Sequence, residues 1–125
     1  MKIGIQTGGI FEQIGVEKGF ETIAAAGFDC IDLNLDAMLG LQWNEMREGK
    51  PSEFFFNKEI YERYAEEIIA ASKKTGVTVG QAHAPFPLHM RGCEEANRNG
   101  LEYAKVCIRI CQMCCLLYTS DAADE

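Results

Sequence analysis

The alternation of strand-like and helix-like segments constrains the fold of this chain more than any other feature. Residues 31–35 give the clearest strand signal, because apolar residues alternate there with acidic and amide residues. Residues 2–7 alternate in the same way before a diglycine turn. A third strand is predicted over residues 77–83, since the prolines that follow it exclude further ladder pairing.

A helical pattern follows each predicted strand. The first helix runs from about Val16 to Gly27, a residue type that commonly ends helices. The second begins at Asn57, whose side chain can cap the helix, and ends at Gly76 after two lysines that favour the negative end of the helix dipole. The third runs from about Glu94 to Cys114, and one side of it carries Leu101, Ala104, Ile108 and Cys111.

This order predicts an α/β protein with parallel strands joined by right-handed crossovers. Two architectures fit the pattern, an open doubly wound sheet and a closed eight-stranded barrel. Three units of either one leave open sheet edges, so we expect the chain alone to be marginally stable and prone to aggregate.

Composition and charge exclude several classes of function. The chain has 125 residues, of which 47% are hydrophobic and 25% charged, as is ordinary for one globular domain. The net charge of −7 opposes binding to nucleic acid, which needs clustered lysine and arginine. No run approaches the roughly 18 apolar residues of a membrane span. We therefore expect a cytoplasmic protein that binds neither nucleic acid nor a membrane.

Residues 115–125 lack the helical period of the residues before them and carry no helix stop signal. Their sequence, CLLYTSDAADE, resembles the in-frame translation of a transposase sequencing adapter along its whole length. We therefore expect residues 115–125 to be a non-native adapter-derived tail, and we predict the native domain to be residues 1–114.

Three cysteines near the end of the third helix have a suggestive spacing. Cys107, Cys111 and Cys114 match the iron–sulfur spacing of radical enzymes that use S-adenosylmethionine. That motif belongs in a loop, whereas these residues share one face of a predicted helix, where buried cysteine behaves as a small hydrophobe. We therefore expect packing contacts rather than a cluster.

Two segments together resemble a known family. Residues 27–33 (GFDCIDL) and 76–86 (GVTVGQAHAPF) are similar to the sugar phosphate isomerase/epimerase family, the xylose-isomerase-like TIM barrels. In that family a helix ends in glycine, the next strand carries an acidic residue where Asp32 stands, and a later strand ends in a His-x-Pro-Phe-like turn. In the family this acidic residue is more often glutamate, whereas here it is Asp32. The resemblance implies that residues 1–114 are the first three β/α units of a (β/α)8 barrel, truncated.

The same resemblance implies a metal-dependent sugar or sugar-phosphate isomerase or epimerase, which transfers a proton next to a sugar carbonyl. The full-length parent would hold a divalent metal ion (Mn, Mg, Co or Zn), bind a small sugar or sugar phosphate, and could assemble as a homo-oligomer. The base and most metal ligands would lie beyond Cys114, so we expect no metal and no activity in this chain. Two alternatives are an endonuclease-IV-like DNA-repair barrel, which the acidic balance disfavours, and a flavodoxin-like binding module without catalysis.

The chemistry of such barrels lies at the carboxyl ends of the strands and in the loops that follow. On that rule the candidate substrate-binding residues are Gln6, Asp32, Asn34, His83 and His89, and none is assigned as catalytic or metal-binding. For Asp32 and Asn34 the alternative is the solvated face of an edge strand, and for His89 it is an ordinary surface position.

Three roles are open for His83: contact with a substrate hydroxyl, metal ligation as in related endonuclease barrels, or a structural bond to backbone. By strand parity His83 shares a face with Val77 and Val79. It therefore reaches the pocket only if those valines fill the barrel interior or a β-bulge intervenes.

The connection over residues 37–56 is long for a loop between a strand and a helix. It contains more large apolar residues than is usual for a solvent-exposed loop, namely Trp43, Met46, Phe54, Phe55 and Phe56. Two hypotheses fit equally, a lid over substrate and a surface that packs on a partner subunit.

Overall fold

The computed structural model describes residues 1–114 and contains one parallel sheet in the order β1-β2-β3. The strands are β1 (Gly4–Gln6), β2 (Cys30–Asn34) and β3 (Thr78–His83). The predicted α/β class with parallel strands is confirmed, and each strand lies close to its predicted place. The predicted non-native tail, residues 115–125, lies outside the described residues.

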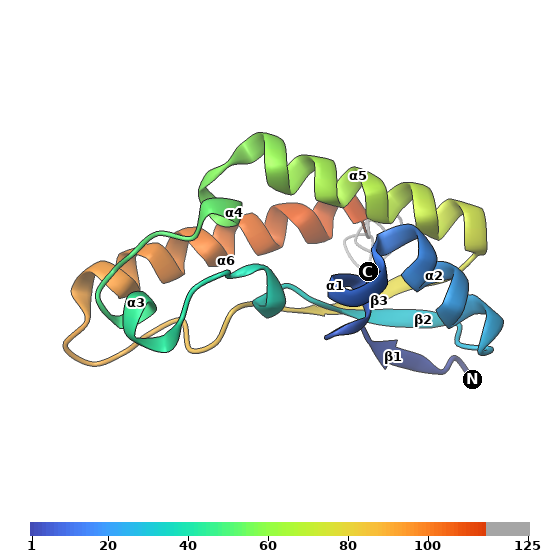
Figure 1. Cartoon of the computed structure of the whole chain (residues 1–125), viewed down its shortest axis with the longest axis horizontal. Helices are drawn as coiled ribbons and strands as arrows, with labels where there is room; N and C mark the ends of the chain where they lie inside the picture. The colour runs from blue at the N-terminus through green and yellow to red at the C-terminus, as the bar shows by residue number, and fades with distance from the viewer. Residues whose placement is uncertain (115–125) are drawn as a thin grey trace, which may run out of the picture.

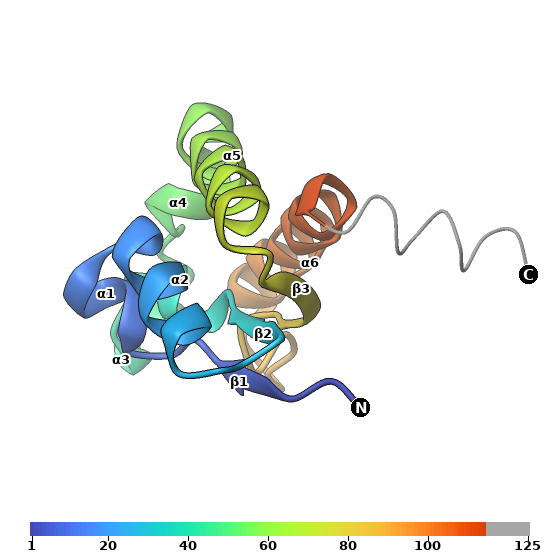
Figure 2. The same cartoon turned by 90° about the vertical axis from the view of Figure 1, so that its right-hand side faces the viewer.

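The helices cover one side of this sheet and leave the other side open (Figures 1 and 2). They are α1 (Ile10–Ile14), α2 (Val16–Ala25), the 3-10 helix η1 (Asp36–Met38), α3 (Trp43–Arg47), α4 (Glu53–Phe56), α5 (Lys58–Thr75) and α6 (Glu94–Cys114). Helix α5 packs between α2 and α6. No helix within residues 1–114 is long and apolar enough to cross a membrane.

The strand order bears on the alternative architectures. In a flavodoxin-like sheet the first strand lies between the second and third, whereas here β2 is the middle strand. The observed order argues against that arrangement. It fits both the start of a closed barrel and the first half of a dinucleotide-binding sheet, because in each the early strands follow one another sideways.

The ends of α2 and α5 follow the predicted chemistry, whereas one short helix was not predicted. The Asn57 side chain accepts a hydrogen bond from the Ile60 amide at 3.3 Å and caps α5, which ends at Gly76 with a φ of 78°. The predicted first helix, which begins at about Val16, is α2. Helix α1 precedes it, and Gly15, with a φ of 85°, separates the two because glycine adopts this left-handed region without steric cost.

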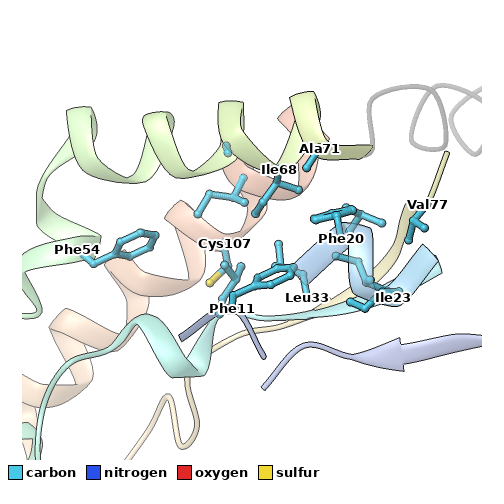
Figure 3. Close-up of a cluster of buried hydrophobic side chains, with 14 of the residues drawn as sticks. Phe11, Phe20, Ile23, Leu33, Phe54, Ile68, Ala71, Val77 and Cys107 are labelled. Carbon is cyan, nitrogen blue, oxygen red and sulfur yellow. The ribbon is translucent and has the colours of Figure 1, made fainter. Parts of the chain in front are cut away.

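The hydrophobic core lies between the sheet and the helices (Figure 3). Ile31 and Leu33 of β2 are each 1% exposed and contribute to the same cluster as Phe20 of α2 and Ile68 of α5. Phe11 stacks on Phe20 with ring centroids 5.5 Å apart, which brings α1 into the same core. Burial of the apolar face of β2 leaves its other face for polar side chains.

The apolar side of α6 that the sequence shows most clearly is not the side that packs into the core. Leu101 and Ile108 are each 60% exposed, whereas Ile110 is fully buried and Tyr103 and Cys107 nearly so. Helix α6 carries two apolar stripes of similar spacing, and its packing on α5 selects the one that contains Ile110. Burial raises the pKa of the Cys107 thiol to about 12, so it is an uncharged packing group.

The long connection after β2 is folded and docked rather than free. Of the five large apolar residues named for it, Met46, Phe54 and Phe55 are buried, and Trp43 and Phe56 are half exposed. The three buried residues therefore serve the core of the chain itself, which neither hypothesis for this segment foresaw. The segment is held on α6 by a 2.9 Å hydrogen bond from the Ser52 amide to the Tyr103 hydroxyl and a 3.0 Å bond from Asn99 Nδ2 to the Gly49 carbonyl.

The two isoleucines of α6 allow a matched test of its buried face. We expect Ile110→Ala to lower the free energy of unfolding by about 2–5 kcal/mol, because it opens a cavity in the core. Ile108→Ala removes the same atoms from an exposed position and should change it by no more than about 0.5 kcal/mol. Urea unfolding followed by circular dichroism measures both, and equal losses would contradict the assignment of faces.

Candidate functional site

A row of polar side chains crosses the open face of the sheet near the carboxyl ends of its strands. The strand register aligns Gln6 with Asp32 and Asp32 with Gln81, and one step further it aligns Asn34 with His83. The row therefore contains four of the five candidate residues, Gln6, Asp32, Asn34 and His83, together with Gln81. Parallel strands bring these residues together because their carboxyl ends share one edge of the sheet.

A β-bulge in β3 places His83 in this row. The register runs Ile31 with Val79 and then Asp32 with Gln81, so Gly80 is an extra residue without a partner on β2. Val79 lies on the buried face, and the inserted residue turns Gln81 and His83 to the open face. The parity that opposed His83 as a site residue is therefore reversed by the bulge.

The Asp32 carboxylate is the centre of the row. His83 Nδ1 donates to its Oδ1 at 2.8 Å, and Gln81 Nε2 donates to its Oδ2 at 2.8 Å. The side chain of Asp32 is only 17% exposed, whereas that of His83 is 54% exposed. Because a carboxylate can only accept, the neutral imidazole carries its proton on Nδ1 and presents the lone pair of Nε2 to the open side.

The remaining two amide side chains are oriented by backbone donors. Gln6 Oε1 accepts from the Gly8 amide at 3.3 Å, and Asn34 Oδ1 accepts from the Asp36 amide at 3.0 Å. Both side chains approach Gly8 so closely that a Cβ atom there would lie 2.6 Å from Gln6 Oε1 and 2.9 Å from Asn34 Nδ2. Any residue larger than glycine at position 8 would therefore clash with these two side-chain amides.

These fixed orientations define what the row offers to a ligand. Within residues 1–114, Gln6 Nε2 and Asn34 Nδ2 have no hydrogen-bond partner and are donors. Gln81 Oε1 and His83 Nε2 have none either and are acceptors in the neutral state. A hydroxyl group both donates and accepts, so a ligand with several hydroxyl groups matches this set.

The structure leaves His89 outside the row, at the surface position given as its alternative, and adds Gln81 to the row. His89 is exposed in the loop after β3, and no hydrogen bond or ion pair joins it to the row in the described part of the chain. Gln81 was missed, although a strand period of two puts it on the same face as His83. That spacing was the signal that could have identified Gln81, because any face that carries His83 also carries the residue two positions before it.

The described residues do not fit a metal site. Among residues 1–114, no three histidine, cysteine or carboxylate side chains are grouped so that they could hold a metal ion. Asp32 already accepts from two side chains, and His83 Nε2 is one ligand where a catalytic site needs three or more from the protein. The side chains of the row therefore offer a ligand hydrogen bonds rather than metal coordination.

No protein-family model, curated protein or solved structure matches this chain. The geometry of the row, together with the arrangement of strands and helices, is thus the basis for assigning a function. The row depends on Asp32, which joins β2 to β3 through side chains as well as through the backbone.

The protonation of His83 can be measured. In the neutral ring we expect the proton on Nδ1, and Asp32→Ala should release the ring to sample both tautomers, because the acceptor that selects one is removed. Imidazole nitrogen chemical shifts report the tautomer directly. His89 provides an internal control in the same spectra, and its shifts should not change. An Nε2-protonated His83 in the unaltered chain would contradict the geometry.

The bulge can be tested by two single deletions in β3. Without Gly80, Gln81 and His83 keep their partners on β2 and stay on the open face, so we expect a small change in the free energy of unfolding. Without Ala82, His83 stands opposite Leu33 on the buried face, and we expect a loss of about 2 kcal/mol or more. Chemical denaturation compares the two variants. Equal losses would contradict the assignment of Gly80 as the extra residue.

Proposed function

We propose that residues 1–114 form part of the substrate-binding site of a sugar or sugar-phosphate isomerase or epimerase with a (β/α)8 barrel. The observation that carries this proposal is the set of two donors and two acceptors on three adjacent strands. The Asp32 carboxylate orients the two acceptors, and backbone amides orient the two donors. Sugars present alternating hydroxyl groups at a spacing that such a row can contact together. Neither a flat apolar ligand nor a polyanion uses both kinds of group.

The arrangement of the layers supports a barrel as the architecture. The strands follow one another in order, and the helices cover one face of the sheet (Figure 2). The open face carries the polar row. In a barrel the open face becomes the interior, and its carboxyl end is the mouth of the active site. The row lies at that end, since Asn34 and His83 are the last residues of β2 and β3.

His83 has the clearest role in this proposal. Its Nε2 lone pair accepts a hydrogen bond from a substrate hydroxyl, while Asp32 keeps the ring in one tautomer and one orientation. Among residues 1–114, no three histidine, cysteine or carboxylate side chains are grouped so that they could hold the metal ion of the proposed reaction. The proposal therefore assigns these residues to binding, and we expect this chain to bind a sugar without converting it.

Binding can be tested by titrating the chain with a panel of aldoses and ketoses, with and without chelator, while amide chemical shifts are recorded. His83→Ala should weaken the binding of any sugar that shifts the row by about three- to tenfold, since one hydrogen bond is lost. His89→Ala is the matched control and should leave the affinity unchanged. We expect the chelator to have no effect.

Three results would contradict the proposal. One is the absence of shifts at Gln6, Asp32 and His83 with every sugar tested. Another is equal weakening by the two histidine variants, which would place the sugar elsewhere. Isomerase turnover by the unaltered chain would contradict the restriction of these residues to binding.

A further inference from the structure

A hollow of about 370 Å³ lies on the open face of the sheet, next to the polar row and toward the amino ends of the strands. Gln6, Asp32 and Gln81 border it. Its floor is formed by Gly4 and Cys30, which pair with each other, and by the bulge residue Gly80. The floor is thus contiguous with the row that the proposed function assigns to sugar hydroxyl groups.

The floor is deep because its residues are small. A Cβ atom added at Gly4 would lie 2.8 Å from Cys30 Sγ, and one added at Gly80 would lie 3.4 Å from the same atom. The Cys30 thiol therefore fills part of the space above both glycines, and nothing larger stands there. The interior of a barrel is ordinarily packed with branched side chains, so this sector has unusual room below the row.

The charge around the hollow favours a neutral occupant. Asp32 is the charged group at its border, and among residues 1–114 no lysine or arginine lines it. Of the free amide atoms at its border, Gln81 Oε1 is an acceptor and Gln6 Nε2 is a donor. A doubly ionised phosphate group needs donors and positive charge, whereas here it would meet one neutral donor, one acceptor and the Asp32 carboxylate without a compensating cation.

We propose that the hollow receives the uncharged, hydroxyl-bearing carbon skeleton of the ligand, and that a phosphate group, where present, stays outside it. The C–H surface of the sugar contacts Gly4, Cys30 and Gly80, while its hydroxyl groups reach the polar row. This inference rests on the proposed function and extends it by naming which part of the substrate this face binds.

The test compares D-fructose, D-fructose 6-phosphate and inorganic phosphate as ligands of the unaltered chain. Amide shifts at Cys30 and Gly80 report occupancy of the hollow. We expect D-fructose to bind at least as tightly as its phosphate ester, and inorganic phosphate to leave these shifts unchanged. Repetition at two salt concentrations should change neither affinity, since a neutral group is not screened.

The outcomes separate the two proposals. Binding of the phosphate ester about tenfold more tightly than the free sugar, with inorganic phosphate as a competitor, would overturn the neutral occupant and leave the sugar site in place. Shifts at Gln6 and His83 without shifts at Cys30 and Gly80 would also keep the sugar site but remove the hollow from it. No response to either sugar would contradict both proposals.

Two substitutions from different strands fill the hollow. Gly80→Ala adds a methyl group at ordinary van der Waals distance from Cys30, and Cys30→Leu adds a larger side chain on the open face. Each should weaken binding of D-fructose by about tenfold with the folded amide spectrum retained. Cys30→Ser keeps the volume and should bind as the unaltered chain does. Unchanged affinity in both filled variants would overturn the inference.

Discussion

Burial of one face of β2 is the constraint on which the other features depend. Ile31 and Leu33 are almost completely inaccessible against α2 and α5, so the strand cannot rotate or slip by one residue without exposing both. Cys30, Asp32 and Asn34 are consequently held on the opposite face. The core thus fixes the direction of the Asp32 carboxylate, and Asp32 in turn orients the side chains that β3 contributes.

Much of this arrangement could be predicted from the amino-acid sequence, because it depends on local periodicity. The strand from Cys30 to Asn34 has a strict period of two, and the helix from Lys58 to Thr75 has both a capping asparagine and a terminal glycine. Asp32 and Asn34 followed from the first of these patterns. In each case the residues that determine the element lie within it or at its ends, so the sequence of that segment was enough to predict it.

The features that escaped prediction depend on contacts between distant segments. Helix α6 has two apolar stripes, and only α5 determines that Ile110 rather than Ile108 is buried. The burial of Phe54 and Phe55 depends likewise on Tyr64 of α5 and Tyr103 of α6, with which their rings make contact. The bulge at Gly80 is set by pairing with β2, so the period of β3 alone left the side of His83 open.

The attachment of the long connection to α6 has a consequence for the way such a site can diverge. Ser52 and Gly49 are tied to Tyr103 and Asn99, which lie on the helix that follows the third strand, not the second. A segment with its own independent fold could be exchanged for another and bring a new specificity with it. Here the loop and α6 are coupled by hydrogen bonds. A change of loop length therefore has to be accompanied by compensating changes about fifty residues later in the chain.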